Sequence, residues 1–271
     1  MTEDAGTIPA LLRSAAAAHP DIVAVTDGER RLSYPALHDA ARTFAAAVVA
    51  SGLGPGDRSG IWAFNCLEWV VAALGTWLAG CVVVPVNTRF KGREAAEVLR
   101  RSRARLLMTV TDFLETDYVE LLRGAGVELP DLDTLVVARG TVPAGASSWS
   151  EFLARATDEV VPEADWRAAA LGPDDPADIL FTSGTTGLPK GVVQTHGRTV
   201  HVATDWVAMT GLGAGDRYLM VNPYFHMFGL KAGILASLAA GATMLPQATF
   251  DVETVLARVE AEAVTVLPGA P

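Results

Sequence analysis

The chain has 271 residues, a length that allows one large domain or two medium ones. Half of the residues are hydrophobic and 19% are charged, which suffices for a packed core and excludes a generally disordered chain. The formal net charge of −10 argues against a nucleic-acid partner, because a nucleic-acid surface needs a basic stripe. A small phosphate pocket is not excluded, since it needs only a few local donors.

Strand-like and helix-like segments alternate along the chain. The predicted elements, in order, are helix 8–18, strands 22–25 and 30–32, a helix from Ser33 to Gly52, strand 58–63, helix 69–79, strand 82–86, helix 94–101, strand 105–109, helix 114–123, strand 134–138, helix 149–156 and, near the end, a buried strand 263–267. Strands alternating with helices of this length imply right-handed crossovers. We therefore predict an α/β fold with mainly parallel sheets flanked by helices.

The sequence PDDP at residues 173–176 interrupts this alternation. Proline and aspartate favour turns over regular elements, so a break in the chain is expected there. We predict a first α/β subdomain over residues 1–170 and a second over residues 171–271, with the second truncated.

Residues 69–86, WVVAALGTWLAGCVVVPV, have about the minimum length of a membrane span. Gly80 and Pro85 interrupt the run, so we predict a buried helix followed by a buried strand, and no integral membrane segment. The acidic start of the chain lacks the basic region of a signal peptide. Cys66 and Cys81 form neither a disulfide framework nor a metal motif, which fits a reducing cytosol and a cytoplasmic location.

One segment carries a chemical pattern that the others lack: residues 182–191 read TSGTTGLPKG, between two apolar runs. We predict a strand–loop–strand hairpin whose loop wraps a phosphate group. Glycines let backbone N–H groups approach an anion, hydroxyls add donors and a lysine supplies positive charge. It is not a Walker A loop, since Pro189 occupies the second glycine position, and the alternative is a Gly/Thr-rich turn. The predicted phosphate ligands are Thr182, Ser183, Gly184, Thr185, Thr186, Gly187 and Lys190.

The stretch TSGTTGLPKG resembles the signature of the adenylate-forming superfamily, which includes acyl-CoA synthetases, aryl-CoA ligases, luciferases and peptide-synthetase adenylation domains. Two weaker stretches agree in order and spacing. Residues 31–37, RLSYPAL, resemble the early "(T/S)Y-x-x-L" element, and residues 78–87, LAGCVVVPVN, resemble the "AG-x-x-x-x-P-(I/L/V)-N" element. The resemblance covers nearly the whole chain and implies an incomplete N-terminal domain of such an enzyme.

Residues 222–229, NPYFHMFG, resemble the "P-x-F-H-x-x-G" element of the acyl- and aryl-CoA ligase branch. The resemblance implies that His226 borders the acyl pocket near the carboxylate, and that the stretch containing Phe228 and Gly229 borders the approach of the thiol, so that all three bind substrate. His226 and Lys190 are assigned catalytic roles; the alternative is a core or interface histidine. Residues 224–231 contain no aspartate to hold an amino group, which favours an acid without an α-amine. The continuation, 230–236, is most similar to ligases for fatty or bulky alicyclic acids, especially steroid-ring propionates. Lys231 is left open between a solvated helix charge and a pocket residue.

The resemblance implies a reaction in two steps, with ATP, Mg²⁺ and coenzyme A as cofactors or cosubstrates. A carboxylic acid attacks the α-phosphate of ATP, forming acyl-adenylate and pyrophosphate, and the CoA thiol then displaces AMP. Family members continue beyond residue 271 with elements that bind adenine, ribose and magnesium and with a small C-terminal domain. We therefore predict no metal ligands within this chain, and little or no ligase activity for these residues alone.

Three alternatives stay open. The enzyme could be an acyl-AMP ligase or luciferase-like protein that does not use CoA, because residues beyond this chain largely choose the acceptor. The chain could be a catalytically dead fragment that retains the fold, or an ATP-binding regulatory module. The exact acid and the oligomeric state, with a homo-oligomer among the options, are left open.

Overall fold

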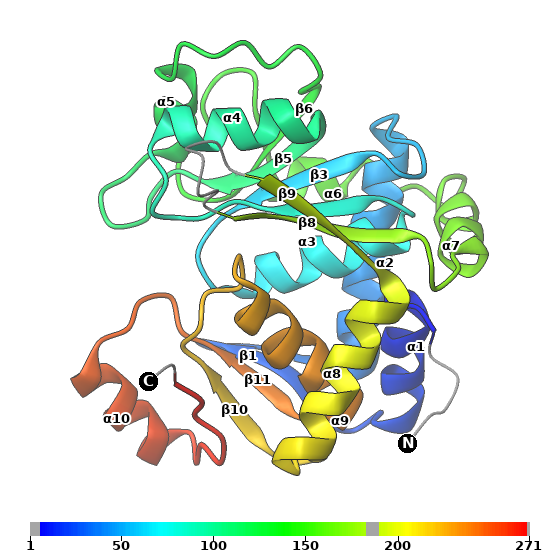
Figure 1. Ribbon diagram of the computed structural model, residues 1–271, viewed down its shortest axis with the longest axis vertical. Coiled ribbons are helices and arrows are strands. Elements are labelled where there is room, and N and C mark those ends of the chain that lie inside the picture. Colours follow the sequence, from blue (N-terminus) through cyan, green and yellow to red (C-terminus); the bar gives the residue numbers. More distant parts are fainter. Residues whose placement is uncertain (1–5, 183–189, 270–271) are drawn as a thin grey trace.

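The computed structural model describes residues 6–182 and 190–269. Two sheets lie one above the other with helices between them (Figure 1). The larger sheet has seven strands in the order β7 (Ser147–Ser148), β6 (Thr134–Arg139), β5 (Ala104–Val110), β3 (Arg58–Trp62), β4 (Val82–Pro85), β8 (Pro176–Thr182) and β9 (Lys190–Thr195). The smaller has four, in the order β10 (Arg217–Met220), β11 (Thr243–Pro246), β1 (Val23–Asp27) and β2 (Arg30–Ser33).

Neighbouring strands run parallel except in two hairpins, β1–β2 and β8–β9. The predicted α/β fold with mainly parallel sheets is therefore confirmed. The helices are α1 (Ile8–Ala18), α2 (Tyr34–Ala50), α3 (Leu67–Leu78), α4 (Gly92–Ser102), α5 (Tyr118–Arg123), α6 (Trp149–Leu153), α7 (Val161–Ala170), α8 (His196–Thr210), the π-helix η1 (Phe228–Leu235), α9 (Ala236–Ala240) and α10 (Val252–Ala261). Both sheets take strands from either side of residue 170, and the division into 1–170 and 171–271 stays a prediction.

Helix α3 is the segment whose sequence imitates a membrane span. Every residue of α3 is buried, because it lies between the two sheets and packs against α2 (Figure 1). The helix ends at Leu78, Gly80 adopts a φ of 73°, and the chain then enters β4, whose residues are all buried. Among the described residues, no helix has the length and apolarity needed to cross a membrane.

The two sheets share one hydrophobic core, and a cluster of charges also joins them. Arg139 on β6 donates to Glu68 at the start of α3, with 2.9 Å between Nε and Oε2, and also contacts Asp27 in the β1–β2 hairpin. Arg30 bonds to the same two carboxylates. The guanidinium groups hold the pKa of the Glu68 carboxyl below its usual range despite burial, which alone would raise it.

Two predicted elements were wrong. The helix expected over 114–123 begins only at Tyr118, because Leu114 and Glu115 have φ angles of 53° and 59°, in the left-handed region. Asp117 caps it by accepting from the backbone N–H of Val119 and Glu120. The strand expected over 263–267 is a single bridge between Val266 and Tyr218, and the segment is half-buried or exposed rather than buried.

Candidate active site

The predicted phosphate-binding segment is a hairpin, as its sequence indicated. Strands β8 and β9 are antiparallel, and Thr182 and Lys190 are direct partners across them. Both residues are exposed, so the Lys190 ammonium is accessible to a ligand, while the Thr182 hydroxyl donates to the Lys190 carbonyl at 3.5 Å. The other predicted phosphate ligands, Ser183, Gly184, Thr185, Thr186 and Gly187, lie outside the described residues.

His226 lies in a tight loop between β10 and η1. Its backbone N–H donates to Pro223 O at 3.0 Å, and its carbonyl accepts from Leu230 N–H at 3.0 Å. Its Nδ1 accepts from the backbone N–H of Phe228 at 3.3 Å. In a neutral imidazole the proton must then sit on Nε2. The side chain is exposed, so this Nε2–H is available to donate to an anionic ligand.

A buried asparagine that the sequence analysis did not single out fixes this loop. Asn65 is 5% exposed and lies three residues after the end of β3; it donates from Nδ2 to Met220 O and Asn222 O, each at 2.9 Å. Its Oδ1 accepts from Tyr224 N–H at 2.8 Å. One side chain therefore satisfies three backbone groups around the Pro223 turn and ties the His226 loop to the larger sheet.

Gly229 is required by close backbone approach rather than by an unusual φ. A Cβ on Gly229 would lie 2.2 Å from Pro223 O and 2.7 Å from Asn222 O, distances that no side chain tolerates. The final glycine of the P-x-F-H-x-x-G pattern thus lets η1 start directly against the turn that carries His226. Phe228, the residue before it, is half-buried and meets the Trp206 ring edge-on, with centroids 5.1 Å apart.

The helix that follows is a π-helix over eight residues, a rare form that is frequently found at functional sites. Residues Gly229–Leu235 are all buried, and Tyr218 Oη donates to the Ala232 carbonyl at 3.0 Å. Lys231 is 2% exposed, so the interpretation of Lys231 as a solvated helix charge is wrong. Its Nζ lies 3.2 Å from Asp178 Oδ2 on β8 and donates to Thr199 Oγ1 on α8 at 2.9 Å.

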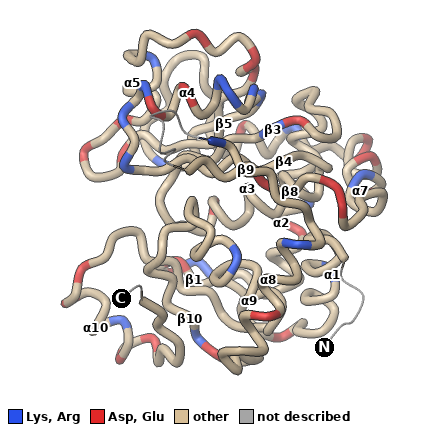
Figure 2. Tube along the Cα trace, viewed as in Figure 1, with Lys and Arg blue, Asp and Glu red and all other residues tan. Residues whose placement is uncertain are grey.

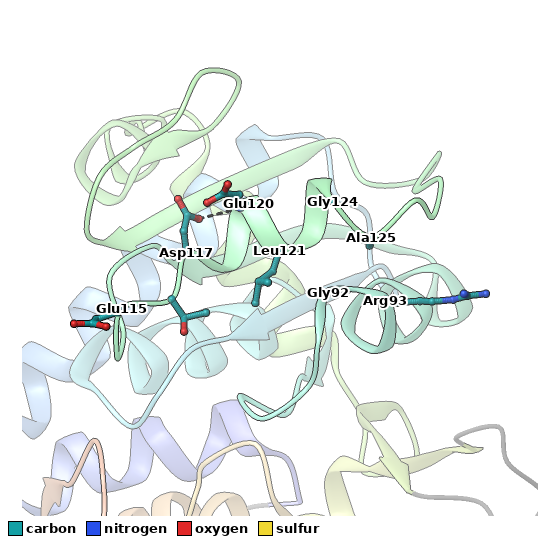
Figure 3. Close-up of a pocket in the computed structure, with 9 residues that line it drawn as sticks. Gly92, Arg93, Glu115, Asp117, Glu120, Leu121, Gly124 and Ala125 are labelled. Carbon is teal, nitrogen blue, oxygen red and sulfur yellow. Dashed lines mark hydrogen bonds between the residues drawn. The ribbon is translucent and has the colours of Figure 1, made fainter.

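A cleft of about 510 Å³ lies beside the His226 loop. Pro223 and Phe225 from that loop line it, together with Asn65 and the exposed side chains of Arg89 and Lys91. A different hollow, shown in Figure 3, lies by α4 and α5 and is lined by no residue predicted for the phosphate or acyl group. In the described part of the chain, no three His, Cys, Asp or Glu side chains group to hold a metal ion.

Positive and negative residues are mixed along the described part of the chain, without one large basic region (Figure 2). Figure 2 shows Lys and Arg positions interspersed with Asp and Glu positions along the trace. The positive groups that matter to the site are therefore the individual side chains already described: Lys190 at the hairpin, and Arg89 and Lys91 at the cleft.

A mostly parallel α/β fold that carries both the β8–β9 hairpin and the His226 loop is the architecture of the N-terminal region of an adenylate-forming enzyme. The family model described as "AMP-binding enzyme" matches residues 12–271. The chain therefore belongs to the AMP-binding enzyme family.

Two relatives match over the whole of this chain. The 3-[(3aS,4S,7aS)-7a-methyl-1,5-dioxo-octahydro-1H-inden-4-yl]propanoyl:CoA ligase of Rhodococcus jostii is 43% identical over 274 residues, and this chain covers 53% of it. The ligase of the same name from Mycobacterium tuberculosis is 42% identical over 272 residues, with 52% of it covered. The chain thus spans about half the length of the curated relatives it matches.

A solved structure agrees with the fold. The inhibitor-bound N-terminal domain of FACL13 from Mycobacterium tuberculosis superposes with a TM-score of 0.81 at 26% identity. The similarity covers 95% of this chain and 61% of that one.

Proposed function

We propose that the protein containing this chain uses ATP to convert a carboxylic acid to its acyl-adenylate, and then transfers the acyl group to coenzyme A. The observation that carries this proposal is the β8–β9 hairpin, whose paired ends present Lys190 and Thr182 to solvent in a chain of the AMP-binding family. The chain supplies the N-terminal part of the enzyme.

The proposed chemistry brings a carboxylate to the α-phosphate of ATP, so neutralising negative charge dominates the barrier. Lys190 would pair with the β- and γ-phosphates as a point charge. Thr182 would exchange its long hydrogen bond to the Lys190 carbonyl, 3.5 Å, for one to a phosphate oxygen. The Nε2–H of His226 would donate to the carboxylate of the acid, while Phe228 and Gly229 would border the path by which the CoA thiol approaches. These assignments use side chains that are exposed or that shape the loop.

Magnesium would reach this site with the nucleotide. Mg²⁺ commonly binds through substrate phosphates and one or two carboxylates rather than through a complete protein cage. The hairpin residues in the described part of the chain offer hydroxyl and ammonium groups, which suit the phosphates rather than the ion.

The acid is proposed to be a bulky alicyclic propionate of the steroid-ring type. Support comes from the two relatives at 43% and 42% identity, whose names give such a propanoyl:CoA ligase. Coenzyme A is proposed as the acceptor on the same grounds, and Arg89 and Lys91 at the cleft would face its phosphates. A cytoplasmic location is proposed because Cys66 and Cys81 are both free and buried. Whether the protein forms a homo-oligomer stays a prediction.

The test is ATP-dependent pyrophosphate release by the native protein over a panel of carboxylic acids, with Lys190→Ala as the variant. A charge-assisted hydrogen bond is worth about 1.5–3 kcal/mol, so K190A should slow release about tenfold or more. Arg13→Ala is the matched control, because it removes an exposed positive charge from α1, outside both the hairpin and the cleft. Equal release by K190A and the wild type would contradict the assignment of the hairpin. Pyrophosphate release without thioester formation would redirect the proposal to an acyl-AMP ligase that does not use CoA.

A further inference from the structure

Three buried polar side chains meet where β8, α8 and η1 come together. Asp178 on β8 is fully buried, Thr199 on α8 is fully buried, and Lys231 on η1 is 2% exposed. Lys231 Nζ is 3.2 Å from Asp178 Oδ2 and 2.9 Å from Thr199 Oγ1. The Thr199 hydroxyl in turn donates to Asp178 Oδ2 at 3.3 Å, closing the triad.

This ion pair is a costly way to stabilise a fold. Burial disfavours both charged forms, since desolvation raises the pKa of Asp178 and lowers that of Lys231, and each partner opposes the other's shift. The second oxygen, Asp178 Oδ1, has no hydrogen-bond partner among the described residues. Replacing a buried ion pair by apolar residues of similar volume is often neutral or stabilising. A gain in stability therefore does not account for the pair.

The position of the pair suggests what it does instead. Asp178 lies four residues before Thr182, on the strand that leads into the hairpin, and Lys231 lies five residues after His226. The two groups therefore connect the elements that carry the two halves of the proposed site. Asn65 holds the start of the His226 loop to the segment that follows β3, a strand of the same sheet as β8.

We propose that the Asp178–Lys231 ion pair, completed by Thr199, is a positioning device that sets the distance between the hairpin and the His226 loop. This inference rests on the proposed function. The carboxylate near His226 must attack, in line, the α-phosphate of an ATP whose β- and γ-phosphates the hairpin holds. A misplacement of about 1 Å can cost about 100-fold in rate. The ion pair and its hydrogen bonds require fixed distances between β8 and η1, whereas apolar contacts are non-directional and would allow a wider range of distances.

The test compares Asp178→Asn, Lys231→Met and the double variant D178N/K231M in the native protein. Each single change leaves one buried group without its partner, so both should unfold at lower urea concentration than the wild type. The double variant should recover most of that loss, because no uncompensated charge is left. We expect its kcat for pyrophosphate release to stay about 10- to 100-fold below wild type, with the KM for ATP changed less than about threefold.

Leu106→Ala is the matched control for lost stability. Leu106 is fully buried on β5, and β3 and β4 lie between β5 and β8 in the sheet. L106A should lower the urea midpoint while leaving kcat per folded molecule at the wild-type value. Thr199→Val provides a second probe if the double variant does not fold, because it keeps both charges and the side-chain shape. T199V should lower kcat several-fold.

The outcomes separate this inference from the function on which it rests. Wild-type kcat in D178N/K231M, or in T199V where the double variant does not fold, overturns the positioning role and leaves the proposed function intact. A kcat loss in L106A as large as that of the double variant also overturns the role, because general destabilisation then explains both. A wild-type protein that releases no pyrophosphate with any acid overturns the proposed function, and the inference with it.

Discussion

Asn65→Ala tests whether a single buried amide holds the His226 loop in place. The substitution removes the three hydrogen bonds that Asn65 makes to Met220 O, Asn222 O and Tyr224 N, at 2.9, 2.9 and 2.8 Å. Each bond contributes about 1 kcal/mol net, so we expect a loss of about 3 kcal/mol in the free energy of unfolding. If no water replaces Asn65 Oδ1 as acceptor, the buried Tyr224 N–H is left unsatisfied, which by itself costs about 1–3 kcal/mol. The total loss in the free energy of unfolding is then larger.

The assay is urea unfolding of the native protein followed by circular dichroism, paired with pyrophosphate release under conditions where N65A is folded. Asn222→Ala is the matched control, because the Asn222 side chain makes one hydrogen bond from the same loop, to Pro268 O at 3.2 Å. It should cost about 1 kcal/mol or less. A value for N65A within about 0.5 kcal/mol of wild type would refute the reasoning, since changes that small are typical of surface positions.

Two further predictions concern the start of η1 and the start of α8. Gly229→Ala should destabilise the protein by about 1–3 kcal/mol, because its Cβ would lie 2.2 Å from Pro223 O. Gly213→Ala should be near neutral in the same urea series, because the nearest atom to its Cβ would be Asp216 Oδ2 at 3.9 Å; equal effects would contradict the close-approach argument. Burial lowers the pKa of His196 to about 4, from 6.5. The unfolded chain then binds the proton more readily, so the stabilisation is fully present above about pH 6.5 and is lost as the pH falls towards about 4. Between pH 7.5 and 4 the wild type should lose about 3 kcal/mol more than His196→Asn in urea unfolding, and parallel pH profiles would count against the assignment.

The alternation of strands and helices could be predicted because β-branched runs and capping signals are local. The helix that begins at Tyr34 follows this rule: Ser33 accepts from the Ala36 N–H, and Pro35 lies in the first turn. Helix α3 was distinguished from a membrane span by Gly80 and Pro85, which end the helix and the strand that follows. In both cases the residues that decide where the element begins or ends lie within a few positions of that boundary.

Local signals failed where apolar spacing and capping disagreed. Leu114, Val119 and Leu122 suggest a continuous helix, but Asp117 is followed three residues later by Glu120, a pattern typical of a helix start. Giving the cap more weight than the apolar spacing would have placed the helix start correctly at Tyr118. The segment 263–267 failed for a different reason: its apolar residues pair with β10 only at Val266, so a strand-like composition did not produce a buried strand.

The residues that support the site were harder to find than those that carry the chemistry. Thr182, Lys190 and His226 lie in contiguous motifs, whereas Asn65 acts on backbone groups 155 to 159 residues away. No periodicity or composition rule connects positions that far apart. The contact exists because β3 and β10 end near each other in the folded chain.

The Asp178–Lys231 contact is an intermediate case, because its existence could have been argued from the sequence although its role could not. Lys231 is the one charged residue in the apolar stretch 227–242, and Asp178 directly precedes the apolar run 179–181. A buried charge is tolerated only with a partner, so two isolated opposite charges in two apolar segments favour a mutual contact. What the sequence does not contain is the direction in which each strand and helix runs from that contact. From the contact, β8 runs towards the hairpin that carries Lys190, and the chain before Lys231 runs back to His226. The folded chain is therefore needed to show that the Asp178–Lys231 pair connects the two.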